Sequence, residues 1–363
     1  MKTWTETIPI NIPGINTQEA IPGMSLPLED TLFFDIETTG FKAEYCNIYM
    51  IGCATFAKDS ATITLLFAEH RHEEKALLEA FSELLCSKNQ CFTFNGNHFD
   101  IPFIEKRATK HGVTIDFTTM PAFDLYLYIK SFRHLIQLDH YKQKDLENYL
   151  GIHREDIYNG GELIPIYKAY DECPNEEGLQ LLKQHNFDDV KGMLRLLPLL
   201  QLGYLYRKDN YVITNMQNIE NEIVFQGTLQ YGVPKPIIYR QEHLYLKLYD
   251  CAFQGILYPK KQTMRYYYEN YKDYIYLPAE DMIIPKVLAD TIPKSEKQRA
   301  TKENCCVKKD SFFLPLPTAG YIESFSQHLF QESYKSKERY IDCSDISWDT
   351  FPIISYLIAY LKA

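Results

Sequence analysis

Three apolar runs between Thr31 and His70 constrain the fold of this chain more than any other feature. They are TLFFDIE at 31–37, IYMIGCATFA at 48–57 and ATITLLFAEH at 61–70, and short segments separate them. Runs of this length that are rich in β-branched and aromatic residues are typical of strands, and closely spaced strands tend to pair antiparallel. We therefore predict an antiparallel meander over this segment.

Helix-like and strand-like segments alternate after the meander. EEKALLEAFSELLC at 73–86 has its apolar residues in the i, i+3, i+4 rhythm of an amphipathic helix. CFTFNG at 91–96 predicts a short strand with a turn, and IPFIEKRATKHG at 101–112 predicts a helix that ends at Gly112. This order indicates an α/β fold with a mixed sheet flanked by helices.

The chain is expected to have three parts. Residues 1–30 contain four prolines and little periodicity, which predicts an extended N-terminal arm. Residues 31–203 form the α/β domain. From 204 to 363 short aromatic-rich runs alternate with Gly and Pro, so we predict a smaller β-rich C-terminal region with helices at 279–292 and 351–363.

Composition indicates an ordinary globular protein, because 45% of the 363 residues are hydrophobic and 24% are charged. No run of about 18 apolar residues occurs, and MKTWTETIPINIPG at the start lacks the pattern of a signal peptide, so we expect a cytoplasmic protein without a membrane partner. The nine cysteines lack CxxC pairs and are expected to be free thiols. A net charge of −10 argues against a protein that coats nucleic acid, but it does not exclude a nuclease with a carboxylate-rich site.

Two carboxylates stand close together at the end of the first predicted strand. Asp35 and Glu37 are i and i+2, so they project from the same face of that strand. Like charges side by side raise each other's proton affinity unless a cation lies between them. The alternative is a solvated strand end before a turn at Gly40, but this leaves two acids on one face of an apolar strand unexplained. We therefore favour a metal site.

Further acids follow at element boundaries. Asp100 lies between a predicted turn and a predicted helix, where it is either a ligand or the N-cap of that helix. His185 and Asp189 are i and i+4 in the apolar-periodic segment 179–200, so they share a helix face, either as part of a site or as an ordinary surface pair. Asp188 lies on a different face and is expected to be solvated.

Three motifs carry a resemblance to a known family. FFDIETTG at 33–40, FNGNHFDIPFI at 94–104 and HNFDDVKGM at 185–193 resemble, in order and spacing, the exonuclease motifs of the DEDD superfamily of 3′-to-5′ exonucleases, which have a ribonuclease H-like fold. In particular, they are similar to bacterial ribonuclease H-like domain proteins related to the proofreading domain of family B DNA polymerases. The resemblance covers about residues 30 to 203.

The resemblance implies a metal site and a mechanism. The positions that match the metal-binding acids of the family are Asp35, Glu37, Asp100 and Asp189, and the resemblance implies two Mg²⁺ or Mn²⁺ ions there. His185 departs from the pattern, because similar proteins usually have tyrosine four residues before the last acid. The departure implies either that His185 orients the attacking water or accepts its proton in place of the tyrosine, or that the site is less active.

Other residues are expected near a bound nucleotide. Thr38, Asn95 and Phe99 flank the motifs and are candidates for hydrogen bonds or base stacking, although Phe99 is equally compatible with the core. Basic residues between Lys286 and Lys309 follow a group of tyrosines at 266–276. This combination is typical of a single-stranded nucleic-acid channel, or of a solvated loop beside a tyrosine-rich core.

The sequence therefore supports a metal-dependent 3′-to-5′ exonuclease that binds single-stranded 3′ ends of DNA or RNA. One alternative is a nuclease-fold module that binds nucleic acid with weak or lost catalysis, and another is a structure-selective endonuclease. The intact set of four carboxylates favours an enzyme, since without a cation their mutual repulsion would be uncompensated.

Overall fold

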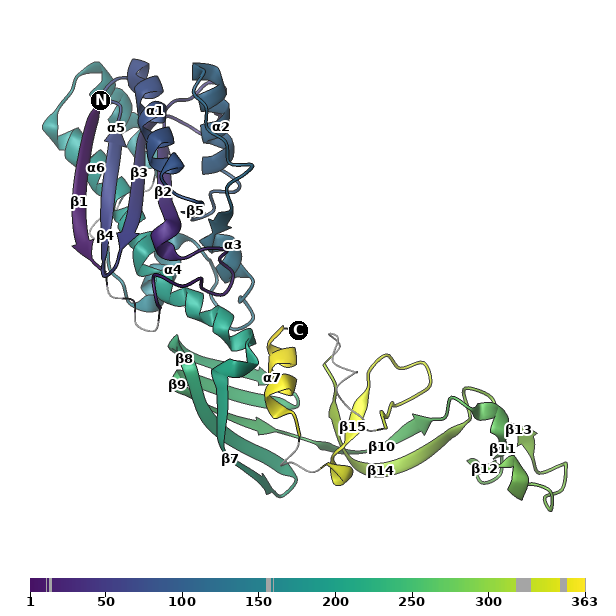
Figure 1. The fold of residues 1–363 in the computed structure, drawn as a ribbon. Helices are drawn as coiled ribbons and strands as arrows, with labels where there is room; N and C mark the ends of the chain where they lie inside the picture. The colour runs from purple at the N-terminus through teal and green to yellow at the C-terminus, as the bar shows by residue number, and fades with distance from the viewer. Residues whose placement is uncertain are drawn as a thin grey trace. The chain divides into compact units, whose positions relative to one another are not determined.

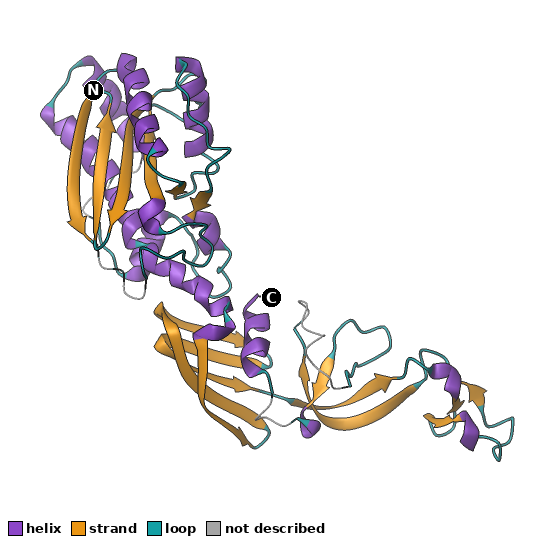
Figure 2. Cartoon of the chain, in the orientation of Figure 1, coloured by secondary structure: helices purple, strands orange, loops and turns teal. Residues whose placement is uncertain are grey.

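The chain divides into two compact units in the computed structural model, which describes residues 1–10, 12, 15–154, 158, 160–317, 328–346 and 351–362. The first unit consists of Met1–Tyr204 with Tyr231–Lys235, and the second of Leu205–Gln230 with Pro236–Ala363. Figure 1 follows the chain through both units. Figure 2 shows that helices and strands are mixed in the first unit, whereas strands predominate in the second.

A six-stranded mixed sheet is the centre of the first unit. Its order is β1-β4-β3-β2-β5-β6, with β1 to β2 antiparallel along this order and β2, β5 and β6 parallel. The strands are β1 Lys2–Pro9, β2 Thr31–Thr38, β3 Ile48–Ala57, β4 Ser60–Phe67, β5 Gln90–Thr93 and β6 Ala122–Asp124. The predicted antiparallel meander is confirmed as β2, β3 and β4.

The first strand lies in the segment that was expected to be an extended arm. Lys2–Pro9 pairs antiparallel with β4, from Lys2 opposite Phe67 to Pro9 opposite Ser60. Its sequence, KTWTETIP, is mostly polar, and much of it is exposed. Polar side chains are common on edge strands, which explains why composition alone gave no strand signal here.

Helices cover both faces of the sheet. They are α1 Glu74–Cys86, α2 Asp100–His111, α3 Leu125–Lys130, α4 Gln143–Leu150, α5 Gly160–Glu172 and α6 Glu176–Arg195. On one face, Phe34 of β2 packs with Phe81 of α1 and Ile104 of α2. On the other, Tyr49 of β3 stacks on Tyr167 of α5 with ring centroids 4.0 Å apart, and α6 crosses β2, β3 and β4. The predicted mixed sheet flanked by helices is confirmed.

A buried ion pair joins the helices of the first face to the sheet. Glu74 and Arg107 are 0% and 1% exposed. The Arg107 Nε donates to Glu74 Oε1 at 2.7 Å, and the same oxygen accepts from the Ile48 backbone N–H at 2.8 Å. Arg107 Nη1 also donates to the Ala43 carbonyl at 3.0 Å. The pair thereby fixes α1, α2 and the loop between β2 and β3.

The second unit contains three small sheets, each of three strands, in the orders β7-β8-β9, β10-β14-β15 and β12-β11-β13. The strands are β7 Tyr211–Ile219, β8 Glu222–Gln241, β9 Leu244–Leu257, β10 Lys260–Tyr267, β11 Tyr274–Leu277, β12 Met282–Pro285, β13 Gln298–Arg299, β14 Cys306–Pro315 and β15 Tyr340–Asp342. The C-terminal helix α7, Ile353–Lys362, agrees with the predicted apolar helix. The β-rich character with helices is confirmed.

One local prediction in the second unit is wrong. Residues 279–292 were expected to be helical, but β12 pairs there with β11 and a 3-10 turn, Lys286–Leu288, follows. Pro285 disfavours helical backbone at the residue before it, which helps to explain the outcome. The strand β8 continues through Pro234 and Pro236. Its pairing with β7 ends at Leu229, so the missing proline N–H groups interrupt no bond to that strand.

The tyrosines at 266–276 contribute to packing within the second unit. Tyr266 packs against Phe330, with ring centroids 6.1 Å apart, and Tyr268 stacks on Tyr274 at 5.1 Å. Two lysines of the basic segment are paired, Lys308 with Asp281 and Lys309 with Asp342. These contacts favour a tyrosine-rich core over a nucleic-acid channel at this place.

No helix within the described part of the chain is long and apolar enough to cross a membrane. All nine cysteines belong to the described residues and are free thiols, as expected.

Neutralising Glu74 should destabilise the first unit strongly. Glu74→Gln leaves the Arg107 guanidinium buried without its countercharge, which typically costs about 3–5 kcal/mol of unfolding free energy. Urea unfolding followed by circular dichroism measures the effect. Glu79→Gln is the matched control, because Glu79 is an exposed partner of Lys75 at 3.8 Å and its loss should cost about 0.5 kcal/mol or less. Equal effects of the two substitutions would contradict a structural role of the buried pair.

Candidate active site

Helix α6 approaches the sheet closely at one glycine. A Cβ atom on Gly52 of β3 would lie 2.3 Å from Asn186 Oδ1 and 2.6 Å from Val190 Cγ2. Gly52 pairs directly with Asp35 of the neighbouring strand β2. Because Gly52 has no side chain, α6 can bring its own polar residues down to the level of the β2 carboxylates.

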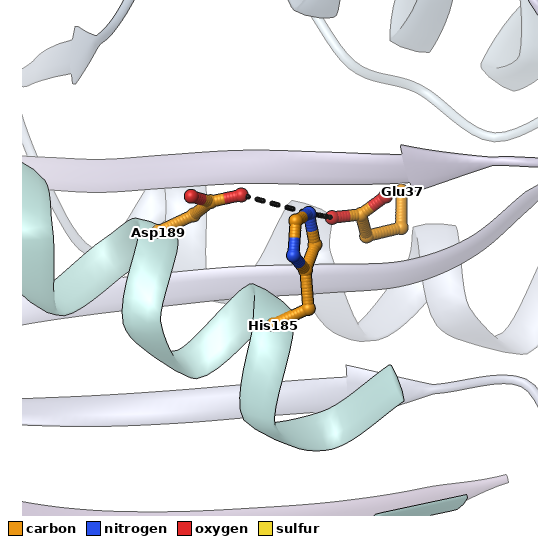
Figure 3. Close-up of side chains that lie close together, drawn as sticks. All are labelled: Glu37, His185 and Asp189. Atoms are coloured by element: carbon orange, nitrogen blue, oxygen red, sulfur yellow. Dashed lines mark ion pairs between the residues drawn. The ribbon is translucent and has the colours of Figure 1, made fainter. Parts of the chain in front are cut away.

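Carboxylates from β2 and α6 meet at this contact (Figure 3). His185 Nε2 lies 3.3 Å from Glu37 Oε1 and 3.2 Å from Asp189 Oδ2. The neighbouring Asn186 donates from Nδ2 to Asp35 Oδ2 at 3.0 Å. His185 is 3% exposed, so it is not part of an ordinary surface pair. Asp35 and Glu37 thus both reach α6, as their alternation in the strand predicts.

Asp100 joins the site from a third element. It is the first residue of α2 and 6% exposed, and its Oδ1 accepts from the backbone N–H of Ile36 in β2 at 3.1 Å. The N-cap position of α2 is Phe99, and no side-chain cap bond is present there. The carboxylate therefore reaches back to the strand between Asp35 and Glu37 and does not cap its own helix.

An arginine that sequence reasoning missed contacts the fourth carboxylate. Arg154 Nη1 pairs with Asp189 Oδ1, and its Nη2 donates to Glu147 of α4 at 2.7 Å. Gln143 of α4 donates to the Asp189 carbonyl at 2.7 Å. A Cβ on Gly192 would lie 2.0 Å from Glu147 Oε1, so this second glycine of α6 makes room for the pair. Nothing in the sequence around Arg154 indicates this contact, because it depends on the packing of α4 against α6.

Each of the four carboxylates has one oxygen on a protein donor. The donors are the Asn186 amide for Asp35, the Tyr49 hydroxyl at 3.5 Å for Glu37, the Ile36 backbone N–H for Asp100 and the Arg154 guanidinium for Asp189. Donors of this kind orient metal ligands from outside the coordination sphere. The arrangement fixes the direction of each carboxylate, and the other oxygens of Glu37 and Asp189, Oε1 and Oδ2, face His185 Nε2.

The electrostatics of the group favour a bound cation. Burial raises the pKa of Asp35 well above its usual range, and the negative charges of Asp189, Asp100 and Glu37 raise it further, whereas Arg154 lowers it. Burial also raises the pKa of Asp100 to about 7, against the lowering effect of its backbone hydrogen bonds. One guanidinium therefore does not balance the four acids, and divalent cations fit the donor set because they prefer carboxylate oxygens.

Three ligand atoms are close enough to hold one ion. Glu37, His185 and Asp189 each offer an atom within 4.8 Å of the others, and no other such group occurs among the described residues. Asp35 and Asp100 lie outside this group, although their charges act on each other and on Asp189. Asp188 does not join the site either. It was expected to be solvated, but it is 9% exposed and therefore buried.

The residues predicted to contact a nucleotide lie around these acids. Thr38 ends β2, and its hydroxyl donates to the Gly40 carbonyl at 2.8 Å. Asn95 has a left-handed backbone with φ of 64°, held by a bond from its N–H to Asp124 Oδ1 at 2.9 Å. Phe99 is half-buried at the start of α2. The role of these three residues in binding a nucleotide stays a prediction.

Two exposed aromatic residues in the loop after β2 were missed. Phe41 and Tyr45 lie in the loop between β2 and β3 and are 78% and 82% exposed. The ring of Phe41 is 6.4 Å from that of Phe99, in an edge-to-face arrangement. Two aromatic residues in the polar segment directly after the first motif are the signal that would have found them.

Gly52→Ala should disturb both packing and the position of Asp35. The added methyl group would overlap Asn186 and Val190, and overpacking of this kind costs about 1–3 kcal/mol. Urea unfolding measures the loss. Gly160→Ala is the control, because its Cβ would lie 3.7 Å from Glu37 Oε2, an ordinary contact beside the same site. Unchanged stability of Gly52→Ala would show that α6 does not depend on this close approach.

The family comparison concerns the first unit. Residues 32–201 match the model of the RNase H superfamily. Among solved structures, a family B DNA polymerase from the hyperthermophilic archaeon Pyrobaculum calidifontis is similar, with a TM-score of 0.39 and 19% identity, over 50% of this chain and 26% of the polymerase chain. The chain thus spans about a quarter of that polymerase. No curated protein matches the chain significantly.

The superfamily match covers the mixed sheet apart from β1 and the first residue of β2, together with the flanking helices and the elements that carry all four carboxylates. It supports a nuclease function for this part of the chain. This part of the chain has a ribonuclease H-like fold.

Proposed function

We propose that the chain is a metal-dependent 3′-to-5′ exonuclease that acts on single-stranded ends of DNA or RNA. The observation that carries the proposal is the convergence of four carboxylates from β2, α2 and α6, each with one oxygen held by a protein donor. These are Asp35, Glu37, Asp100 and Asp189. Their positions match the three motifs that resemble exonucleases of ribonuclease H-like fold.

Two Mg²⁺ or Mn²⁺ ions at these carboxylates would supply the charge that activates water and stabilises the leaving 3′ oxygen. The chain's own part is to hold the acids in place. Asn186 binds one oxygen of Asp35, and Arg154 binds one oxygen of Asp189. These contacts fix the orientation of both carboxylates before the substrate binds. His185 lies against Glu37 and Asp189 and therefore belongs to the same catalytic set.

Exposed aromatic residues in the loop after β2 support a single-stranded substrate. Phe41 and Tyr45 offer ring faces on which unpaired bases can stack, and Phe99 lies next to Phe41. Asn95 is a proposed hydrogen-bond partner of the terminal nucleotide. The Thr38 hydroxyl donates its hydrogen to the Gly40 carbonyl, so it would act as a hydrogen-bond acceptor toward the nucleotide. With a net charge of −10, binding would depend on stacking and on the cations more than on basic surface.

Degradation of end-labelled single-stranded DNA and RNA with Mg²⁺ or Mn²⁺ tests the proposal. We expect shortening from the 3′ end by the wild-type protein and a loss of about 10²-fold or more in rate for Asp189→Asn, because one shared ligand is neutralised. Asp188→Asn is the matched control, since it removes the same charge from the adjacent residue of α6 and should keep the activity.

Each other outcome of this experiment has a meaning. Products of internal cleavage would show that the protein is an endonuclease that uses the same acids, and not an exonuclease. If the protein binds the oligonucleotides but cleaves them with neither metal, the proposal of an enzyme is overturned and a nucleic-acid-binding module is favoured. An equal loss in Asp189→Asn and Asp188→Asn would show that charge on α6, and not a specific ligand, matters.

Replacing Phe41 and Tyr45 together by Ala should weaken substrate binding. Stacking contributes about 1–3 kcal/mol per base, so the KM for a single-stranded oligonucleotide should rise by about tenfold or more with little change in stability. Fluorescence anisotropy with a labelled oligonucleotide in the Asp189→Asn background measures the binding alone. Val287→Ala is the control, because Val287 is also 82% exposed but lies in the second unit. Unchanged affinity would exclude these rings from the binding surface.

A further inference from the structure

We propose that one face of the β8–β9 sheet in the second unit is an accessory binding surface for single-stranded nucleic acid (Figure 1). We call it the outer face, and its side chains are those of Ile238, Arg240, Tyr245, Lys247 and Tyr249. The inference rests on the proposed function for the identity of the ligand, since a nuclease must hold nucleic acid. Binding at the outer face nevertheless requires none of the four carboxylates, so it can be measured separately.

The alternation of the two strands defines the outer face. Every second residue is buried, and these inner positions are Ile237 and Tyr239 of β8 with Leu244, Leu246 and Leu248 of β9. The Tyr239 hydroxyl donates to the Tyr360 carbonyl of α7 at 3.2 Å, so α7 lies on the inner side. The residues between the inner positions point the opposite way. Among them, Ile238 is 52% exposed although it is aliphatic.

The outer face is positively charged in an acidic protein. Its charged side chains are Arg240 and Lys247, whereas the whole chain has a net charge of −10. The nearest acids along these strands are Glu242, which pairs with Lys260, and Asp250, which has a left-handed backbone with φ of 45°. An anionic ligand therefore fits this face. A second copy of the chain fits it less well, because two identical faces would bring like charges together.

Each cation of the outer face lies against a tyrosine ring. The Arg240 Cζ is 5.2 Å from the ring centroid of Tyr245, and the Lys247 Nζ is 5.2 Å from that of Tyr249. Cation–π contacts of this kind hold the charged groups beside the rings. Surfaces that bind single strands combine the same two elements, with charge for the phosphates and ring faces for the bases. A duplex keeps its bases stacked inside, so the tyrosines favour a single strand.

A groove at one end of the outer face has room for a nucleotide. Its volume is about 490 Å³, and its lining residues are Arg240, Gln241, Leu244, Tyr245, Ile256 and Tyr258. Small-molecule sites typically measure about 300–1,000 Å³, so the size suits one base with its sugar. Two tyrosines in the lining offer rings for stacking, and Arg240 supplies a charge for the neighbouring phosphate.

Fluorescence anisotropy of a labelled single-stranded oligonucleotide with the full chain in EDTA tests the inference, because the carboxylate site then lacks the cations that would attract phosphate. We expect Arg240→Glu with Lys247→Glu to weaken binding by about tenfold or more. The plot of log K against log[salt] should also become shallower by about 1.4, since each lost phosphate contact of a single strand contributes about 0.7.

The matched control is Lys272→Glu with Lys302→Glu, which changes the net charge equally at exposed positions of the same unit. It should keep the wild-type affinity and salt dependence. An equal loss in both double variants would show an effect of net charge alone and would overturn the inference. Dimers of the wild type that the Arg240 and Lys247 variant dissociates in sedimentation velocity, without any oligonucleotide bound, would assign the face to a second copy and overturn it too.

A second pair of variants tests stacking without a change of charge. Tyr245→Leu should weaken binding by about tenfold, whereas Tyr245→Phe keeps the ring and should restore the affinity. Thermal unfolding by circular dichroism checks that both variants are folded. Equal affinities of the two variants would contradict stacking at this position. Cleavage with Mg²⁺ or Mn²⁺ but no binding in EDTA would overturn only the inference, and binding in EDTA without cleavage in any metal would overturn only the proposed exonuclease.

Discussion

The candidate site depends on the close contact of α6 with the sheet at Gly52. This glycine pairs with Asp35 in β2 and lies under Asn186, so the amide of Asn186 can reach the Asp35 carboxylate. One residue earlier on the helix, His185 reaches Glu37 by the same approach. A helix held one side-chain layer farther away would leave the β2 acids without these partners. The chemistry of the site is thus set by a missing side chain as much as by the charged ones.

Crowded carboxylates oppose folding, and the surrounding structure compensates for them. Burial and mutual repulsion raise the pKa of Asp35 and Asp100, which means that ionising both without a cation is unfavourable. Arg154 supplies one fixed positive charge, and a separate buried pair, Glu74 with Arg107, fixes α1, α2 and the loop after β2. Functional sites commonly break local rules in this way while the rest of the fold supplies the stability.

Local periodicity predicted the features of the site that depend only on residues close together in the sequence. The alternation in β2 placed Asp35 and Glu37 on one face, and the spacing on α6 placed His185 with Asp189. The partners Arg154 and Asn186 were not predictable, because their roles follow from how α4, α6 and β3 pack. The strand β1 was missed because its polar edge sequence has no apolar period, and 279–292 was misassigned because pairing with β11 outweighed its helical pattern.

The histidine in place of the tyrosine found in similar proteins changes the chemistry without changing the helix. Residues i and i+4 lie one above the other on a helix face, so the spacing to Asp189 puts His185 over the same carboxylates. An imidazole is shorter than a phenol, and its Nε2 ends between Glu37 and Asp189 instead of extending beyond them. A tyrosine there would present a hydroxyl oxygen, whereas the histidine presents a nitrogen lone pair. The substitution therefore places an imidazole instead of a phenol against Glu37 and Asp189, while the four acids keep the positions that the resemblance implies.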